Sequence, residues 1–355
     1  MNLDSFLHTS GEWLRGAGPE ADIVVSTRIR LARNLASFPF SNRATPHQKA
    51  EIEHSLRDRF AKLDFNPTLE YLNLGQLTQL DRQFLVERQL ISRELANSDG
   101  PRGAVLSKAE TISVMVNEED HLRLQVLRCG FDLDEAWQEI DRLDDALEQK
   151  VNYAFSEEFG YLTACPTNVG TGMRASVMMH LPALVTNKEI EKVFRALQKI
   201  NLAVRGLYGE GSRASGDFYQ ISNQVTLGKS EAVILTDLRG VIPQIIQYER
   251  HAREVLTRDR RPFVEDKVRR AFGTLTSATM MTSEETMDLL SSVRLGVNLG
   301  LLDDMTIPQV NELFLHTQPA HLQRQTGASL DGEERNAARA KYLRNRIREL
   351  GSSLN

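Results

Sequence analysis

The sequence contains an acidic run, Glu118-Glu119-Asp120, which is followed by the titratable His121 and by Arg123. Alternating apolar residues precede this run in 111–116 and follow it in 122–127, a pattern typical of two strands joined by a short polar turn. An acidic turn alone is most often only a solvated turn. Carboxylates accompanied by arginines are, however, what transfer of a phosphoryl group to a basic acceptor requires.

Two further arginines, Arg28 and Arg30, lie in 23–34, a stretch with the pattern of a strand. Residues two apart on a strand share one face, so both guanidinium groups would point the same way. Such a pair suits phosphate oxygens, because each guanidinium fork can donate two parallel hydrogen bonds. An exposed basic strand face explains this segment equally well.

The known glycine-rich phosphate loops are absent from the sequence. Gly228-Lys229-Ser230 resembles the end of a P-loop, but Asn223 stands where that motif requires a glycine. Gly209 and Gly211 are followed by Ala214, which excludes the dinucleotide-binding and protein-kinase glycine patterns. If ATP binds, arginine side chains rather than backbone amides must hold its phosphates.

The composition is that of a globular protein of one large or two smaller domains: 355 residues, 41% hydrophobic and 26% charged. A net charge of -5 argues against direct nucleic-acid binding. Cys129 and Cys165 form neither a disulfide framework nor a metal-ligand pattern. We see no signal peptide and no apolar run of roughly 20 residues that could span a bilayer. These features predict a cytoplasmic protein without a membrane association or a resident metal site.

The predicted secondary structure changes near residue 255, from strands and helices to helices alone. Before it, strands are expected at 23–34, 111–116, 122–127, 202–207 and 218–223, and an apolar run occupies 175–181. Helices are expected from 46, at 78–96, 133–155, 187–200 and 231–256. After it, only helices are expected, at 263–272, 283–295, 307–315 and 333–350. The fold class is therefore α+β, with a catalytic domain at 1–255 and a helical domain at 256–355. Residues 208–217, rich in small side chains around Glu210, predict a loop that can close over a ligand.

Five segments together resemble the phosphagen (guanidino) kinases, and they occur in the order of that family: 26–30, 117–123, 165–171, 174–177 and 205–210. The resemblance implies a curved antiparallel sheet flanked by helices. Two departures point to one branch of the family. Only 25 residues precede Ser26, where phosphagen kinases carry a helical domain, and about 100 helical residues follow position 255. That layout is similar to the bacterial protein-arginine kinases.

The resemblance implies a role for each residue of the catalytic site. Glu119 corresponds to the acid/base residue and Glu210 to a second carboxylate that grips the guanidinium. Cys165 and Glu118 would lie near the guanidino substrate, and His121 is expected to be structural. Mg²⁺ is inferred from ATP chemistry, since no protein ligand set is visible. The residues expected to bind ATP are Ser26, Thr27, Arg28, Arg30, Arg123, Arg174 and Arg205.

The C-terminal helices allow two interpretations. They could complete the core or form a homodimer interface. They could also bind phosphoarginine through Arg335, Asn336, Arg339 and Ala340, where Asn336 replaces an aspartate of the related motif.

The activity implied is ATP-dependent phosphorylation of arginine side chains in proteins. The implied partners are arginine-bearing protein substrates, a heat-shock repressor, a zinc-finger activator and a Clp unfoldase that degrades the marked proteins. A free-arginine kinase and a non-catalytic phosphoarginine-binding adaptor are the alternatives.

Overall fold

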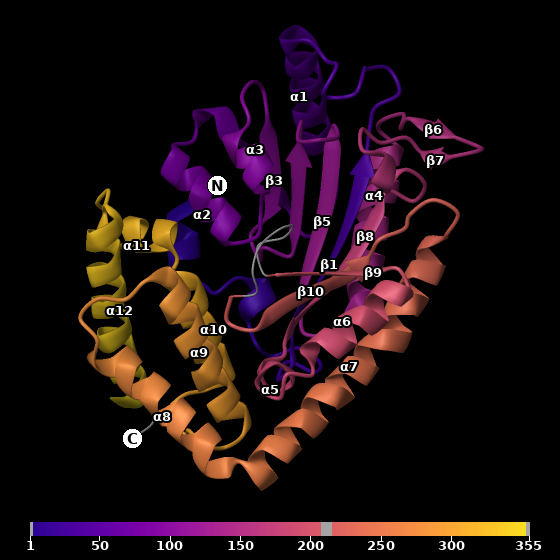
Figure 1. Ribbon diagram of the computed structural model, residues 1–355. Helices are drawn as coiled ribbons and strands as arrows, with labels where there is room; N and C mark the ends of the chain where they lie inside the picture. Colours follow the sequence, from indigo (N-terminus) through magenta and orange to yellow (C-terminus); the bar gives the residue numbers. More distant parts are fainter. Residues whose placement is uncertain (1–2, 207–214, 353–355) are drawn as a thin grey trace.

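The centre of the molecule is an eight-stranded antiparallel sheet (Figure 1), in a computed structural model that describes residues 3–206 and 215–352. The strand order is β2-β3-β4-β5-β1-β8-β10-β9. The predicted curved sheet flanked by helices is thereby confirmed. The strands are β1 (Val24–Arg33), β2 (Leu69–Asn73), β3 (Gly103–Ser107), β4 (Ile112–Val116), β5 (Leu122–Cys129), β8 (Met173–His180), β9 (Leu202–Gly206) and β10 (Phe218–Asn223).

Strand β1 lies in the middle of this sheet, between β5 and β8. Its residues alternate between two environments. Ile29 and Leu31 are fully buried on the face covered by α4 (Leu133–Glu148), whereas Arg28 and Arg30 point to the other face and remain partly accessible. The register places Arg30 opposite Arg174 of β8. The strand thus separates an apolar core from a basic face, as the spacing of its arginines predicts.

The predicted hairpin around the acidic run is also confirmed, because β4 and β5 pair antiparallel from Val116–Leu122 to Ile112–Val126. Helix α1 (Pro46–Ala61) begins at the predicted position: Thr45 and Gln48 form a capping box, and Pro46 occupies the first helical position. Helices α5 (Pro182–Thr186) and α6 (Ile190–Lys199) lie between β8 and β9 in the chain.

Several boundaries differ from the prediction. The helix expected at 78–96 is two helices, α2 (Gln79–Glu87) and α3 (Arg93–Asn97), because the chain turns at Gln89, whose φ is 62°. Helix α4 ends at Glu148, before the expected end at 155, since the chain there enters the small sheet β6 (Phe155–Ser156) and β7 (Gly160–Tyr161). Strands β2 and β3 were not predicted, because β2 lies at the sheet edge without a clear alternation.

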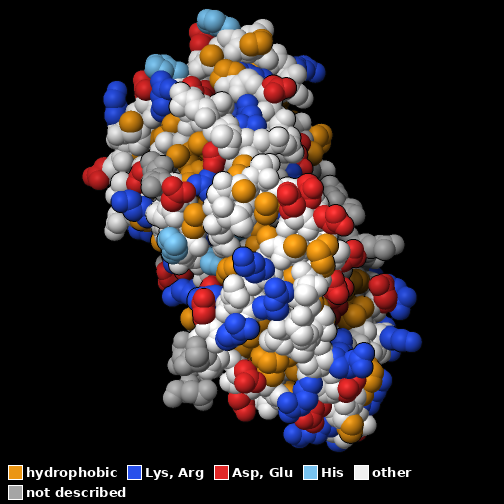
Figure 2. All heavy atoms as spheres, turned by 90° about the vertical axis from the view of Figure 1, so that its left-hand side faces the viewer, with side chains coloured by type: hydrophobic (Ala, Val, Ile, Leu, Met, Phe, Trp, Pro, Cys, Tyr) orange, Lys and Arg blue, Asp and Glu red, His pale blue; other side chains and the backbone are white. Residues whose placement is uncertain are grey.

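Helices alone follow β10 within the described residues, as predicted. They are α7 (Glu231–Asp259), α8 (Arg261–Ser277), α9 (Ser283–Asn298), α10 (Ile307–His316), α11 (Pro319–Thr326) and α12 (Gly332–Ser352), of which α11 was not predicted. Figure 2 looks onto the side formed by α11 and α12 and shows basic side chains, interspersed with acidic ones, over the lower part of this face. No helix in the described part of the chain is long and apolar enough to cross a membrane.

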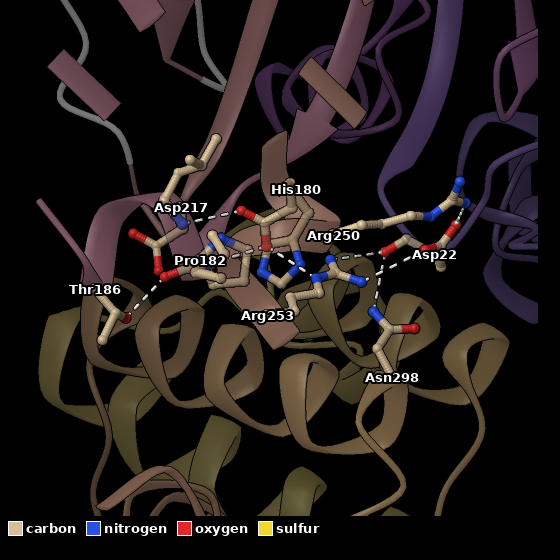
Figure 3. Close-up of polar contacts among 12 residues, drawn as sticks. Asp22, His180, Pro182, Thr186, Asp217, Arg250, Arg253 and Asn298 are labelled. Carbon is tan, nitrogen blue, oxygen red and sulfur yellow. Dashed lines mark hydrogen bonds and ion pairs between the residues drawn. The ribbon is translucent and has the colours of Figure 1, made fainter. Parts of the chain in front are cut away.

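A buried polar cluster joins these helices to the sheet (Figure 3). Arg294 of α9 donates to the carbonyl oxygens of Ala21 and Asp22, at 2.7 and 3.0 Å, and to His180 Nδ1 at 2.9 Å. Asn298 donates to the same Asp22 carbonyl at 2.9 Å. Burial and the Arg294 charge hold the pKa of His180 well below its usual range, so this histidine is neutral and its Nε2 donates to Ser291.

Candidate active site

The polar face of the sheet forms the floor of an open cleft of about 790 Å³, a volume typical of a small-molecule site. Arg28 and Arg30 of β1 line it together with Arg123 of β5, and the segment around Cys165 forms part of its wall. The structure therefore brings together, from five separate parts of the sequence, the residues expected to bind the nucleotide and the acceptor: Arg28, Arg30, Glu118, Glu119, Arg123, Cys165, Arg174 and Arg205.

Among the described residues, Arg28 is hydrogen-bonded to neutral partners only. Its Nη1 donates to Gln89 Oε1 at 3.0 Å and its Nη2 donates to Gln220 Oε1 at 2.7 Å. Burial, followed by the nearby charges of Arg174 and Arg123, lowers the pKa of Arg28 to about 10. A guanidinium that is oriented by amides, without a bonded carboxylate to cancel its charge, is prepared to bind an anion.

Arg30 lies deeper in the same cluster. Its Nε is buried without a hydrogen-bond partner in the described structure. Burial, followed by the charges of Arg28, Arg123 and Arg174, lowers the pKa of Arg30 well below its usual value, and Glu118 opposes this shift. An unpartnered buried donor costs free energy that an incoming phosphate oxygen would recover.

Arg123 connects the basic floor to the acidic turn. Its Nη1 donates to Glu118 Oε1 at 2.7 Å, and its Nη2 lies 3.3 Å from Glu119 Oε2. Glu118 is buried and also accepts from Ser92 Oγ at 2.7 Å. The Glu119 side chain is 44% exposed at the cleft, and partial burial raises its pKa while Arg123 opposes the rise. Glu118 is thus fixed in place, whereas Glu119 remains accessible to an acceptor.

Asp120 and His121 point away from the cleft and support the turn. Asp120 Oδ1 accepts from Asn34 Nδ2 at 2.6 Å and from the backbone amide of Ala164 at 2.7 Å. His121 Nδ1 accepts from the Leu35 amide at 3.0 Å, so its Nε2 carries the proton and donates to the Pro39 carbonyl at 3.0 Å. Burial lowers the pKa of His121 and keeps it neutral. Both residues are structural, as expected for His121.

Two more arginines complete the basic wall. Arg174 of β8 donates from Nε and Nη2 to Ser222 Oγ at 3.3 and 3.1 Å, and Arg205 of β9 lies opposite Gln220 in the strand register. Cys165 Sγ lies 3.0 Å from Thr167 Oγ1 at the cleft wall. Glu210, the second predicted carboxylate, lies outside the described residues.

The predicted contact of Thr27 with a nucleotide is contradicted by its orientation. Thr27 is fully buried on the opposite face of β1, where its hydroxyl donates to the Gly130 carbonyl at 2.7 Å and accepts from the Asp132 amide at 3.1 Å. Alternation along the strand places its neighbour Ser26 on the same face as Arg28, beside Met178. Thr27 therefore ties β1 to the start of α4.

The proposed phosphoarginine site on α12 also needs correction. Arg339 is buried and donates to the carbonyls of Thr317 and Met281 at 2.9 and 2.8 Å, to Ser283 Oγ at 2.7 Å and to Asn336 Oδ1 at 3.0 Å. Ala340 is fully buried, and Arg335 donates to the Leu330 carbonyl at 2.7 Å. Because Arg339 is buried and donates to four internal acceptors, its side chain supports the packing of α12 in this structure.

Sequence reasoning missed the residues that orient the charged groups of the cleft. Gln89, Gln220 and Ser222 bond the arginines, and Ser92 bonds Glu118. For Gln220 and Ser222 a signal existed, since two polar residues alternate with Tyr219 and Ile221 on a strand beside Arg174. For Gln89 there was none, because its position depends on the turn that separates α2 from α3.

Comparison with known proteins agrees with this geometry. Residues 51–252 match the family described as ATP:guanido phosphotransferase, C-terminal catalytic domain, which is the class of enzyme that the sheet and its arginine-lined cleft define. Residues 261–355 match the Protein-arginine kinase McsB C-terminal domain. The protein-arginine kinase of Halothermothrix orenii is 47% identical over 348 residues, which are 98% of this chain and 99% of the relative. The chain therefore belongs to the protein-arginine kinases, and it is a phosphotransferase.

Two further relatives carry the same name. The protein-arginine kinase of Symbiobacterium thermophilum is 48% identical over 338 residues, covering 94% of this chain and 96% of the relative. That of Bacillus anthracis is 45% identical over 352 residues, covering 98% and 99%.

Solved phosphagen kinases share the fold. The duplicated taurocyamine kinase from Schistosoma mansoni, with bound transition-state analogue components, has a TM-score of 0.60 and 27% identity over 64% of this chain and 33% of that chain. Lombricine kinase has a TM-score of 0.58 and 27% identity over 68% of this chain and 70% of that chain.

Proposed function

We propose that the arginine-lined cleft binds the phosphates of ATP and that the acidic turn beside it receives the arginine side chain of a protein. The observation that carries this proposal is the charge arrangement of Arg28 and Arg30. Burial and the charges of nearby arginines lower both pKa values. No carboxylate among the described residues is hydrogen-bonded to Arg28 or to Arg30. Such a cluster is electrostatically incomplete until an anion of several negative charges occupies it.

The arginines have two roles in this proposal. They hold the nucleotide, and they offset the charge that spreads over the transferring phosphoryl oxygens as the bond to the leaving oxygen breaks. Arg123 links both halves of the site, because it contacts Glu118 and Glu119 while it faces Arg28 and Arg30. Movement of the acceptor is thereby coupled to the position of the phosphates.

Glu119 is proposed as the proton acceptor. The guanidinium of an arginine substrate has a pKa of about 12.5 or above, so one of its nitrogens must lose a proton as it attacks phosphorus. Partial burial raises the pKa of Glu119, which increases its proton affinity. Glu118 is already bonded to Ser92 and Arg123 and would orient rather than exchange protons. Glu210 is proposed as the second carboxylate that grips the guanidinium of the acceptor.

Magnesium is proposed to enter with the nucleotide. The described residues contain no group of three His, Cys, Asp or Glu side chains placed to hold a metal ion. A Mg²⁺ ion that arrives with ATP would be held chiefly by phosphate oxygens and water, which is how this ion commonly binds at phosphoryl-transfer sites. The ion would neutralise part of the phosphate charge.

The cellular context is proposed from the family resemblance. We propose a cytoplasmic enzyme that marks proteins for a Clp unfoldase and protease, inactivates a heat-shock repressor and responds to a zinc-finger activator. We also propose that the chain divides in function near residue 255, in the last turns of α7, and that the helical part contributes to a homodimer.

The test is a phosphorylation assay with two acceptors. The protein is incubated with ATP and Mg²⁺ and either an unfolded arginine-rich protein or free arginine, and acid-labile phosphate is measured. We expect label on the protein. Label on free arginine alone would identify a free-arginine kinase, and label on neither would identify a non-catalytic adaptor. Glu119→Gln should lower kcat by about 10²-fold or more with little change in ATP affinity, because it removes the proton acceptor only.

A further inference from the structure

The small hairpin formed by β6 and β7 exposes two phenylalanines. Phe155 is 58% exposed and Phe159 is 44% exposed, and the turn between them carries the exposed carboxylates Glu157 and Glu158. The described structure contains no ion pair of either glutamate. Figure 1 shows this hairpin projecting from the edge of the molecule, beyond the main sheet. Exposed aromatic rings flanked by polar side chains are enriched at protein–protein contact sites.

The hairpin is held rigidly at its base. The guanidinium carbon of Arg33 lies 3.5 Å from the centre of the Tyr161 ring. Arg33 is itself fixed by a buried ion pair with Asp144, at 2.6 Å. Phe155 packs edge-on against Tyr161, with ring centroids 5.2 Å apart. Aromatic residues presented on a fixed base lose little conformational entropy when they bind, which is typical of contact residues.

The same base is continuous with the catalytic turn. Asn34 accepts from the Ala154 amide through its carbonyl at 2.7 Å, and its side chain donates to the Leu162 carbonyl at 3.1 Å. That side chain also donates to Asp120 at 2.6 Å, and Asp120 adjoins Glu119. One asparagine therefore connects both sides of the hairpin base to the acidic turn at the cleft.

A second connection runs along the other wall of the cleft. Tyr161 and Gly170 form an isolated antiparallel bridge, and Gly170 lies directly against Thr226 and the exposed Leu227, where an added Cβ would be within 2.8 Å of both. Thr226 Oγ1 in turn bonds the carbonyls of Thr167 and Val169. Thr167 and Thr226 line the cleft. The segment that pairs with the hairpin at Gly170 is therefore bonded to residues of the cleft wall.

We propose that this hairpin is a docking surface for the substrate polypeptide next to its target arginine. The proposal rests on the proposed function, because only a protein acceptor extends beyond the cleft. The occupant is an unfolded segment that bears an apolar side chain and basic residues near the phosphorylated arginine. Phe155 and Phe159 contact the apolar side chain, while Glu157 and Glu158 attract the positive charges.

The test compares a protein acceptor with a small one. The full-length chain, its Phe155→Ser/Phe159→Ser variant and the control Phe263→Ser are assayed on an unfolded arginine-rich protein and on N-acetyl-arginine amide. Phe263 is 47% exposed on α8, so the control removes an equally exposed ring elsewhere. A second variant, Glu157→Lys/Glu158→Lys, changes only exposed side chains and preserves the hairpin.

We expect both hairpin variants to raise KM for the protein acceptor, the phenylalanine pair by about tenfold, which corresponds to losing part of two aromatic contacts. The kcat/KM for N-acetyl-arginine amide and the KM for ATP should change by less than about twofold, a separation that damage to the cleft would not produce. Phe263→Ser should behave like the parent chain.

Three results would overturn the proposal. They are an unchanged KM for the protein, an equal loss with both acceptors, and a change of sedimentation from dimer to monomer in the phenylalanine variant, which would assign the hairpin to a contact between copies of the chain. Failure of the proposed function is distinguishable, because the parent chain would then phosphorylate no protein acceptor at all.

Discussion

Gln220 offers the sharpest test of how the cleft handles charge. Its Oε1 accepts from Arg28 Nη2 at 2.7 Å, and the side chain is buried. Gln220→Glu keeps the size of the side chain and places a carboxylate against Arg28. The new anion would cancel part of the charge with which Arg28 attracts a phosphate.

The size of the effect follows from Coulomb's law. Two unit charges about 4 Å apart interact with ~4 kcal/mol at an effective dielectric constant of about 20. If about half of this attraction is withdrawn from the nucleotide, ATP binding weakens by ~2 kcal/mol, which is roughly thirtyfold in Kd. Stability without nucleotide should not fall, because the carboxylate relieves repulsion among Arg28, Arg123 and Arg174.

The assay combines calorimetric titration with a non-hydrolysable ATP analogue and thermal unfolding of the free protein. Gln224→Glu is the matched control, since Gln224 is exposed in the same cleft and makes no contact with Arg28. It adds the same charge where solvent screens it, so its Kd should rise by less than about threefold. An unchanged Kd in Gln220→Glu, or an equal rise in both variants, would refute the electrostatic account.

Three other substitutions test separate parts of the structure. Thr27→Val should lower the free energy of unfolding by about 1–2 kcal/mol and leave the KM for ATP unchanged, because its two hydrogen bonds are structural; denaturant unfolding and initial rates measure both. Burial raises the pKa of Glu87 to about 7, above the unfolded value of about 4.3. The contribution of Glu87 to stability should therefore decline as pH rises from about 4 to 7. Denaturant titrations across this range should show less decline in the free energy of unfolding of Glu87→Gln. Arg339→Leu should cost about 3 kcal/mol in thermal unfolding, since it leaves buried carbonyls unpaired, whereas the exposed control Arg348→Leu should cost almost nothing.

Regular patterns explain which parts of the fold could be predicted from the sequence. Period-two alternation located β1 and the β4–β5 hairpin, and it placed Arg28 and Arg30 on one face. The same rule would have removed Thr27 from the nucleotide contacts, because odd and even positions of a strand point in opposite directions. That error came from treating a run of similar residues as one site.

Other features depend on contacts that no local pattern records. Gln89 reaches Arg28 only because the chain adopts a positive φ between α2 and α3. Arg339 was expected at a ligand site, yet it became a buried support, since the acceptors at Thr317 and Met281 lie 22 and 58 positions away along the chain. Long-range partners of this kind decide whether an arginine binds a ligand or holds the fold.

The cluster around Arg294 has a consequence for dissecting the chain. Residues 21 and 22 precede the first strand, whereas Arg294 and Asn298 belong to α9, the fourth helix from the end. These two side chains nevertheless donate hydrogen bonds to the carbonyl oxygens of residues 21 and 22. Cutting the chain near residue 255 would remove the partners of the Ala21 carbonyl and of both ring nitrogens of His180, and it would leave the Asp22 carbonyl with its longer bond from Arg253 Nη2, at 3.3 Å. A fragment ending there should not fold to the native state, so the two sequence regions unfold as one cooperative unit.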